Sequence, residues 1–235
     1  MATILIAWEL GGGLGHLSML DPPAREWLRR GHRVVAALRD LSRAEEVFAG
    51  SGVEYLQSPL RTRRVADPFP SPCTFPQILH NVGLANLPEM RAVLGAWRTI
   101  YDTVRPDLVV FDHAPSAILA ARGRDFVQAA TGTGFCVPPD VFPFPDWRPW
   151  HKTPPEQLQR DEVALLAALN QLLAEAGQPP LERIGQLYGD LDEPMLTTFA
   201  ELDHYGPRAA ARYWGVWHSM RGATPQWPVA QGPRV

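Results

Sequence analysis

Residues 4–17 of the 235-residue chain read ILIAWELGGGLGHL, and the pattern of this segment predicts the fold class. An apolar run over 4–8 ends at Glu9, and three consecutive glycines follow. From His16 to residue 30, leucine, alanine and tryptophan recur at helical spacing. A strand that passes through a glycine-rich turn into a helix is the start of an α/β unit, and the free N–H groups at the start of such a helix favour polar and anionic ligands.

Strands and helices continue to alternate along the chain. Apolar runs predict further strands at residues 32–38, 53–56, 108–112, 126–130 and 195–199. Helices are predicted at residues 16–30, 42–48, 75–104 with an interruption near Gly83 and Pro88, 115–122 and 156–175. The alternation predicts an α/β fold class, with a Rossmann-like, doubly wound and mostly parallel sheet whose first five strands are ordered 3-2-1-4-5. Pro22 and Pro23 predict an irregular start to the first helix, with its firm part beginning near Pro23.

Composition and charge exclude several classes of protein. The net charge is -3 and the isoelectric point is about 6.2, so we expect neither a nucleic-acid partner nor an anionic membrane surface. We find no signal-peptide pattern, and no apolar run approaches the ~20 residues of a transmembrane helix. Cys73 and Cys136 lack metal-site spacing. We favour two reduced thiols in a cytoplasmic protein over a single disulfide.

Three chemistries are compatible with a glycine-rich turn, and two of them fit poorly here. A phosphate-binding P-loop would end in Gly-Lys-Ser/Thr, whereas this turn ends in Gly15, His16 and Leu17. A dinucleotide-binding fingerprint would carry a third glycine where His16 stands, although Asp40 occupies the place of the ribose-binding acid. A dinucleotide-dependent oxidoreductase therefore stays as a minor alternative.

The third chemistry is general-base catalysis by His16. A histidine base needs an acidic partner that orients its ring. Strands one and four are neighbours in the predicted sheet, so the turn with His16 and the end of the strand at Asp112 should meet at one crevice. His16 as a backbone-capping turn residue and Asp112 as a helix N-cap remain open alternatives. We expect His113 to point to the opposite face of its strand.

Three motifs occur in the order and spacing of one family. They are Gly15-His16, the strand PDLVVFD at 106–112, and the late ELD at 201–203 followed by YWG at 213–215. The chain resembles the N-terminal, acceptor-binding domain of GT-B-fold, UDP-glycosyltransferase-like enzymes. The resemblance implies that His16 is the catalytic base and Asp112 its partner. It also implies that Gly11, Gly12, Gly13 and Gly15 keep the turn low enough for acceptor and donor to approach.

The same resemblance implies where the substrates bind. The aromatic loop around residues 135–150 would form part of the acceptor pocket, with His113, Phe135, Phe142 and Trp147 as substrate contacts. No cofactor or metal is implied, because a nucleotide-sugar, expected to be a UDP-sugar, acts as co-substrate. The loop at 58–76 carries Arg61, Arg63 and Arg64. We favour a solvated surface loop over a role in substrate binding for these arginines.

The same resemblance implies where the domains begin and end. We expect residues 1–210 to form the Rossmann-like acceptor-binding domain and residues 211–235 to form a linker toward a second domain, which in the family holds most of the nucleotide-sugar. This chain would then need a missing C-terminal domain or partner chain to bind the donor. The alternative is a non-catalytic binding module or a subunit of a split enzyme. For either, we expect the aromatic residues after 212 to pack on another domain, on another chain or on a second copy of this chain.

Overall fold

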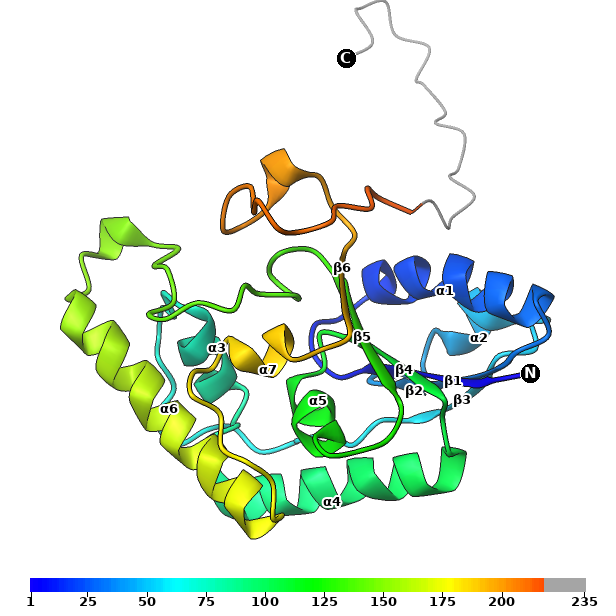
Figure 1. The fold of residues 1–235 in the computed structure, drawn as a ribbon, viewed down its shortest axis with the longest axis horizontal. Helices are drawn as coiled ribbons and strands as arrows, with labels where there is room; N and C mark the ends of the chain where they lie inside the picture. Colours follow the sequence, from blue (N-terminus) through cyan, green and yellow to red (C-terminus); the bar gives the residue numbers. More distant parts are fainter. Residues whose placement is uncertain (218–235) are drawn as a thin grey trace, which may run out of the picture.

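The computed structural model describes residues 1–217 and places a parallel sheet between helices on its two faces (Figure 1). The strands are β1 (Thr3–Trp8), β2 (Arg33–Leu38), β3 (Glu54–Gln57), β4 (Leu108–Asp112), β5 (Val127–Gly132) and β6 (Glu193–Leu196). Their order is β3-β2-β1-β4-β5-β6, and every neighbouring pair is parallel. The predicted fold class and the predicted 3-2-1-4-5 order are therefore confirmed.

Helices connect consecutive strands and cover both faces of the sheet. They are α1 (Leu14–Arg29), α2 (Ala44–Phe48), α3 (Phe75–Asn81), α4 (Leu87–Val104), α5 (Pro115–Ala121), α6 (Pro155–Glu175) and α7 (Gln186–Gly189). Two single 3-10 turns, η1 (Pro149–His151) and η2 (Ala200–Leu202), lie in the later loops. The helix predicted for 75–104 is divided into α3 and α4, as the interruption near Gly83 and Pro88 indicated.

The two faces of β1 pack against different helices. Ile6 and Trp8 are fully buried in a cluster with the apolar residues of α1 and α2. Leu5 and Ala7 point the other way, into a larger cluster that includes α4, α5 and α6. Successive side chains of a strand point to opposite faces, so a strand at the centre of a two-sided core must be apolar at every position. This requirement explains the unbroken apolar run that begins the chain.

The chain leaves β1 and β4 in opposite directions, which opens a crevice between them. The two strands pair in parallel with Trp8 opposite Asp112, and the Leu10 N–H donates to the His113 carbonyl oxygen at 3.0 Å just beyond the paired strands. From β1 the chain enters α1 on one face, and from β4 it enters α5 on the other face. In open α/β sheets, this change of direction at the carboxyl ends of the strands is where ligands bind.

Helix α1 differs from its prediction. It runs from Leu14 to Arg29 with Pro22 and Pro23 inside it, so the predicted irregular start was wrong. Each proline removes one backbone hydrogen bond. Leu17 and Leu20 before the prolines and Ala24 after them are nonetheless buried against the sheet. Burial of this face on both sides of the proline pair offsets the lost hydrogen bonds and keeps the helix continuous.

The last strand is shorter and earlier than predicted. β6 ends at Leu196, and Leu196 then bridges to Tyr213 while the Trp214 N–H donates to the Leu196 carbonyl oxygen at 2.9 Å. The start of the predicted linker is thus attached to the sheet edge. Most of that linker, Trp227 included, lies outside the described residues, and the limit at 210 stays a prediction.

No helix within residues 1–217 is long and apolar enough to span a membrane.

The central position of β1 makes its inward residues sensitive to truncation. We predict that Leu5→Ala lowers the free energy of unfolding by about 3 kcal/mol, because Leu5 is fully buried in the centre of the sheet. Chemical denaturation of both proteins measures the difference. Val163→Ala on the exposed face of α6 is the matched control and should change stability by less than about 0.5 kcal/mol.

Candidate functional site

His16 and Asp112 lie in hydrogen-bond contact although 96 positions separate them in the sequence. His16 lies in the first turn of α1 and Asp112 ends β4, and Nδ1 of the imidazole is 2.7 Å from Oδ2 of the carboxylate. Burial raises the pKa of Asp112, while the hydrogen bond and the charge of His16 act in the opposite direction. The structure therefore brings together the pair that the sequence predicted, and its carboxylate is shielded from water.

Two aromatic rings lie nearly parallel to the His16 imidazole. The Trp8 ring centroid is 5.2 Å away with an interplanar angle of 22°, and the His113 centroid is 6.4 Å away with an angle of 21°. These contacts and the Asp112 hydrogen bond restrict the ring to one orientation. A fixed imidazole is what proton transfer to a positioned substrate requires.

The orientation of His113 corrects the sequence prediction. We expected this side chain on the opposite face of the strand, but it stacks beside His16. His113 has a φ of 44°, a left-handed backbone conformation that ends the alternation of side chains along β4. Burial lowers the pKa of His113 to about 3, so its ring is neutral, and its buried Nε2 has no hydrogen-bond partner within residues 1–217.

The glycines of the turn have different functions in the structure. Gly11 has a φ of +85°, and a Cβ at this position would overlap Nε2 of His16. Gly13, with a φ of +78°, immediately precedes α1. Gly12 and Gly15 have open space where a Cβ would be, and both line a cavity. Gly11 is therefore required for the position of His16, a reason that the sequence analysis did not identify.

A cavity of about 550 Å³ adjoins this turn. His16 and Asp112 form part of its wall, and Thr131, Thr197 and Thr198 line it from the ends of β5 and β6. The hydroxyl of Thr197 is buried and has no hydrogen-bond partner among the described residues. The volume suits a small organic molecule, and these hydroxyl groups are available to orient it.

The threonines were missed by sequence reasoning. Thr131 lies near the carboxyl end of β5, and Thr197 and Thr198 directly follow β6. Their position at the carboxyl edge of a parallel sheet was the signal that could have identified them. Cys136 also lines the cavity. Burial and the nearby Asp112 raise the pKa of its thiol to about 12, so Cys136 stays protonated and is not a candidate nucleophile.

The predicted aromatic contacts lie apart from this cavity. Phe135 packs edge-on against His113 with ring centroids 5.3 Å apart, and Trp147 packs against Phe135 at 5.2 Å. Phe142 is 44% exposed, and none of the three lines the cavity. Phe135 therefore packs against His113, and Trp147 packs against Phe135. Direct contact of these aromatic residues with a substrate stays a prediction.

Glu9 is a buried acid that the sequence analysis did not single out as functional. One carboxylate oxygen accepts from the Ser116 N–H at 2.9 Å and from the Ala117 N–H at 3.4 Å. Burial raises the pKa of Glu9 to about 7, and the hydrogen bonds and the charge of Arg39 only partly oppose this. Glu9 thus links the end of β1 to the start of α5 and changes its protonation near neutral pH.

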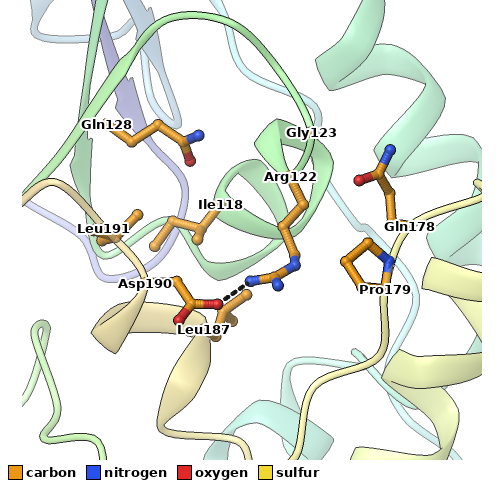
Figure 2. Close-up of a pocket in the computed structure, with 9 residues that line it drawn as sticks. All are labelled: Ile118, Arg122, Gly123, Gln128, Gln178, Pro179, Leu187, Asp190 and Leu191. Carbon is orange, nitrogen blue, oxygen red and sulfur yellow. Dashed lines mark hydrogen bonds and ion pairs between the residues drawn. The ribbon is translucent and has the colours of Figure 1, made fainter.

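Figure 2 shows a different cavity, of about 250 Å³, beside the end of α5. Its most polar contact is the ion pair between Arg122 and Asp190, whose atoms are 2.9 Å apart. Gln128, near the start of β5, and Gln178 also line it. This cavity lies at the amino edge of the sheet, away from His16, and its charges already neutralise each other.

Among residues 1–217, no group of three or more His, Cys, Asp or Glu side chains is arranged to hold a metal ion.

Comparison with known proteins identifies the fold. No protein-family model matches the sequence, and no curated protein matches it. Among solved structures, the glycotransferase of kitacinnamycin matches 99% of this chain and 56% of its own, with 21% identity and a TM-score of 0.59. The calicheamicin glycosyltransferase matches 83% of this chain and 47% of its own, with 21% identity and a TM-score of 0.51.

These similarities show that the chain has the Rossmann-like fold of one half of a GT-B glycosyltransferase. It spans about half the length of the structures that it matches. Both of these matched structures are glycosyltransferases.

The contact between Gly11 and His16 predicts a specific effect of a single methyl group. Gly11→Ala should displace the His16 ring and break its hydrogen bond to Asp112, because the new Cβ would occupy the position of Nε2. The ¹⁵N chemical shifts of the His16 ring report this change. Gly12→Ala is the matched control, since its Cβ meets nothing. Unchanged His16 shifts in Gly11→Ala would contradict the steric argument.

Glu9 predicts a pH dependence of stability. A carboxyl whose pKa rises from 4.5 in the unfolded chain to about 7 in the folded chain binds more protons when folded, so its contribution to stability is lost as the pH rises from about 4.5 to about 7. Relative to Glu9→Gln, the wild-type free energy of unfolding should fall over this range by on the order of 3 kcal/mol. Denaturation at several pH values measures it, and a constant difference between the two proteins would exclude the titration.

Proposed function

We propose that this chain is the acceptor-binding part of a glycosyltransferase that transfers a sugar from a nucleotide-sugar to an acceptor hydroxyl, with His16 as the general base. The observation that carries the proposal is the hydrogen bond of 2.7 Å between Nδ1 of His16 and the buried carboxylate of Asp112. The fold, the position at the switch between β1 and β4, and the adjoining cavity support it.

The geometry suits proton abstraction from a hydroxyl. When Nδ1–H donates to Asp112, the imidazole is in the tautomer whose Nε2 carries the free lone pair. Nε2 takes the proton of the acceptor hydroxyl while that oxygen attacks the anomeric carbon of the sugar. The bond from the anomeric carbon to the nucleotide diphosphate breaks, and the diphosphate leaves. Attack from the side opposite the leaving group inverts the anomeric centre.

Asp112 stabilises the imidazolium that this step produces. A carboxylate beside a protonated histidine interacts with it more strongly when water is excluded, and Asp112 is buried. The same contact holds the imidazole in the productive tautomer before the reaction. General-base catalysis of this kind contributes about 10²–10⁴-fold to the rate.

The proposal includes the substrates and the compartment. The acceptor is a small molecule that enters the cavity beside His16, and the donor is a nucleotide-sugar, with a UDP-sugar as the first candidate. In this proposal a second domain or a partner chain holds the nucleotide. Cys73 and Cys136 are free thiols, which supports a reducing compartment such as the cytoplasm.

Two substitutions test the catalytic assignment. His16→Ala should reduce sugar transfer by about 10²–10⁴-fold, and Asp112→Asn by about a hundredfold or more, while the affinity for the nucleotide-sugar stays within a factor of about two. Turnover and donor affinity are measured with the chain alone and with a nucleotide-sugar-binding second domain supplied.

His151→Ala is the matched control, because this exposed histidine in η1 lies outside the cavity and should leave turnover unchanged. Full activity of His16→Ala would refute the assignment of the base. Loss of donor affinity in parallel with turnover would instead show that His16 acts in nucleotide binding.

A further inference from the structure

A second, smaller cavity lies next to the glycine-rich turn and is strongly basic. Its volume is about 240 Å³. Arginines from two separate segments line it: Arg39, directly after β2, and Arg61, Arg63 and Arg64 in the loop after β3. Another part of its wall is formed by Glu9 and Leu10, which lie between β1 and the glycine-rich turn.

Most of the positive charge in this cavity is not neutralised within the described residues. Arg63 and Arg64 make no hydrogen bond or ion pair with any group in residues 1–217. Arg39 donates only to the main-chain oxygen of Glu9, at 2.8 Å. Arg61 alone has an acidic partner, since its guanidinium lies 2.6 Å from a carboxylate oxygen of Glu89. Three guanidinium groups are therefore available to an anion.

Acidic side chains near the cavity do not cancel this charge. Glu9 is the one acid in its wall, and its carboxylate is held by the N–H groups of Ser116 and Ala117. Burial raises the pKa of Glu9 to about 7, so near neutral pH it carries only part of a negative charge. Asp40, beside Arg39, is exposed and accepts from the Ser42 N–H at 2.8 Å.

The basic cavity lies close to His16, the candidate catalytic base. Leu10 in its wall immediately precedes Gly11, and Gly11 packs against the His16 ring. The cavity with Thr131 and Thr197 adjoins the same turn through Gly12 and Gly15. The glycine-rich turn therefore separates an apolar and hydroxyl-lined cavity from a basic one.

We propose that the basic cavity binds a carboxylate or phosphate group of a small molecule through Arg39, Arg63 and Arg64. The planar guanidinium group matches both anions with paired hydrogen bonds. A volume of about 240 Å³ holds one such group rather than a whole substrate. If the proposed function holds, on which this further step rests, the anion belongs to the acceptor and anchors it while its hydroxyl reaches His16.

Anion binding is measured directly and without turnover. The ¹⁵N-labelled chain is titrated with sodium phosphate and, separately, with sodium benzoate at constant ionic strength. We expect saturable shifts of the amides of Glu9, Leu10 and residues 61–64 with at least one of the two anions. Arg63→Gln/Arg64→Gln should weaken that binding about tenfold or more, because two charge-assisted contacts are lost. Both arginines are exposed and have no partner in the described part of the chain, so the variant should keep the wild-type spectrum elsewhere.

Arg29→Gln/Arg30→Gln is the matched control. It changes the charge by the same amount in another adjacent pair of exposed arginines, which lies at the far end of α1. This control should bind the anion as the wild type does. Equal weakening in both double variants, or no saturable shift with either anion, would overturn the proposal.

Two further measurements separate this proposal from the proposed function. His16→Ala should bind the anion like the wild type. If this variant also kept full transferase activity, anion binding in the basic cavity would be supported and only the assignment of His16 as the general base would be refuted. UDP is titrated as well. Tighter binding of UDP than of phosphate or benzoate at the same amides would assign the cavity to the donor diphosphate and overturn its assignment to the acceptor.

Discussion

The parallel pairing of β1 with β4 fixes the geometry of the candidate site. It places Trp8 opposite Asp112, and the chain then leaves the two strands toward opposite faces of the sheet. The turn after β1 must cross the end of β4, and His16 at the start of α1 therefore meets Asp112. A slip of one residue in this register would turn Asp112 to the other face and separate the pair.

Around that pair, the molecule combines a rigid imidazole with little competing charge. Trp8 and His113 stack beside the ring, and the buried His113 is neutral because burial lowers its pKa. Asp112 is thus the one acid in contact with His16 among the described residues. In surroundings from which water is excluded, a single fixed carboxylate has a large effect on the charged form of its partner. The Gly11 backbone leaves the space that this arrangement needs.

The glycine-rich turn also divides the ligand-binding edge of the sheet into two environments. Threonines at the carboxyl ends of β5 and β6 line one cavity, and arginines from the segments that follow β2 and β3 line the other. Since all strands are parallel, their carboxyl ends lie at the same edge, and residues distant in sequence contribute to both cavities. The arginines that we interpreted from sequence as a solvated loop are gathered there with Arg39, which comes from a different segment.

The α/β class, the strand order around β1 and the proximity of His16 to Asp112 could be predicted from the sequence, because apolar periodicity and turn residues are local signals and the topology rules follow from them. The continuity of α1 through Pro22 and Pro23 and the orientation of His113 could not be predicted from local sequence. Both depend on packing and on one unusual backbone angle. The buried state of Glu9 and the two cavities were decided in the same way. Burial and enclosed volume are properties of surroundings contributed by distant segments, and no local pattern contains them.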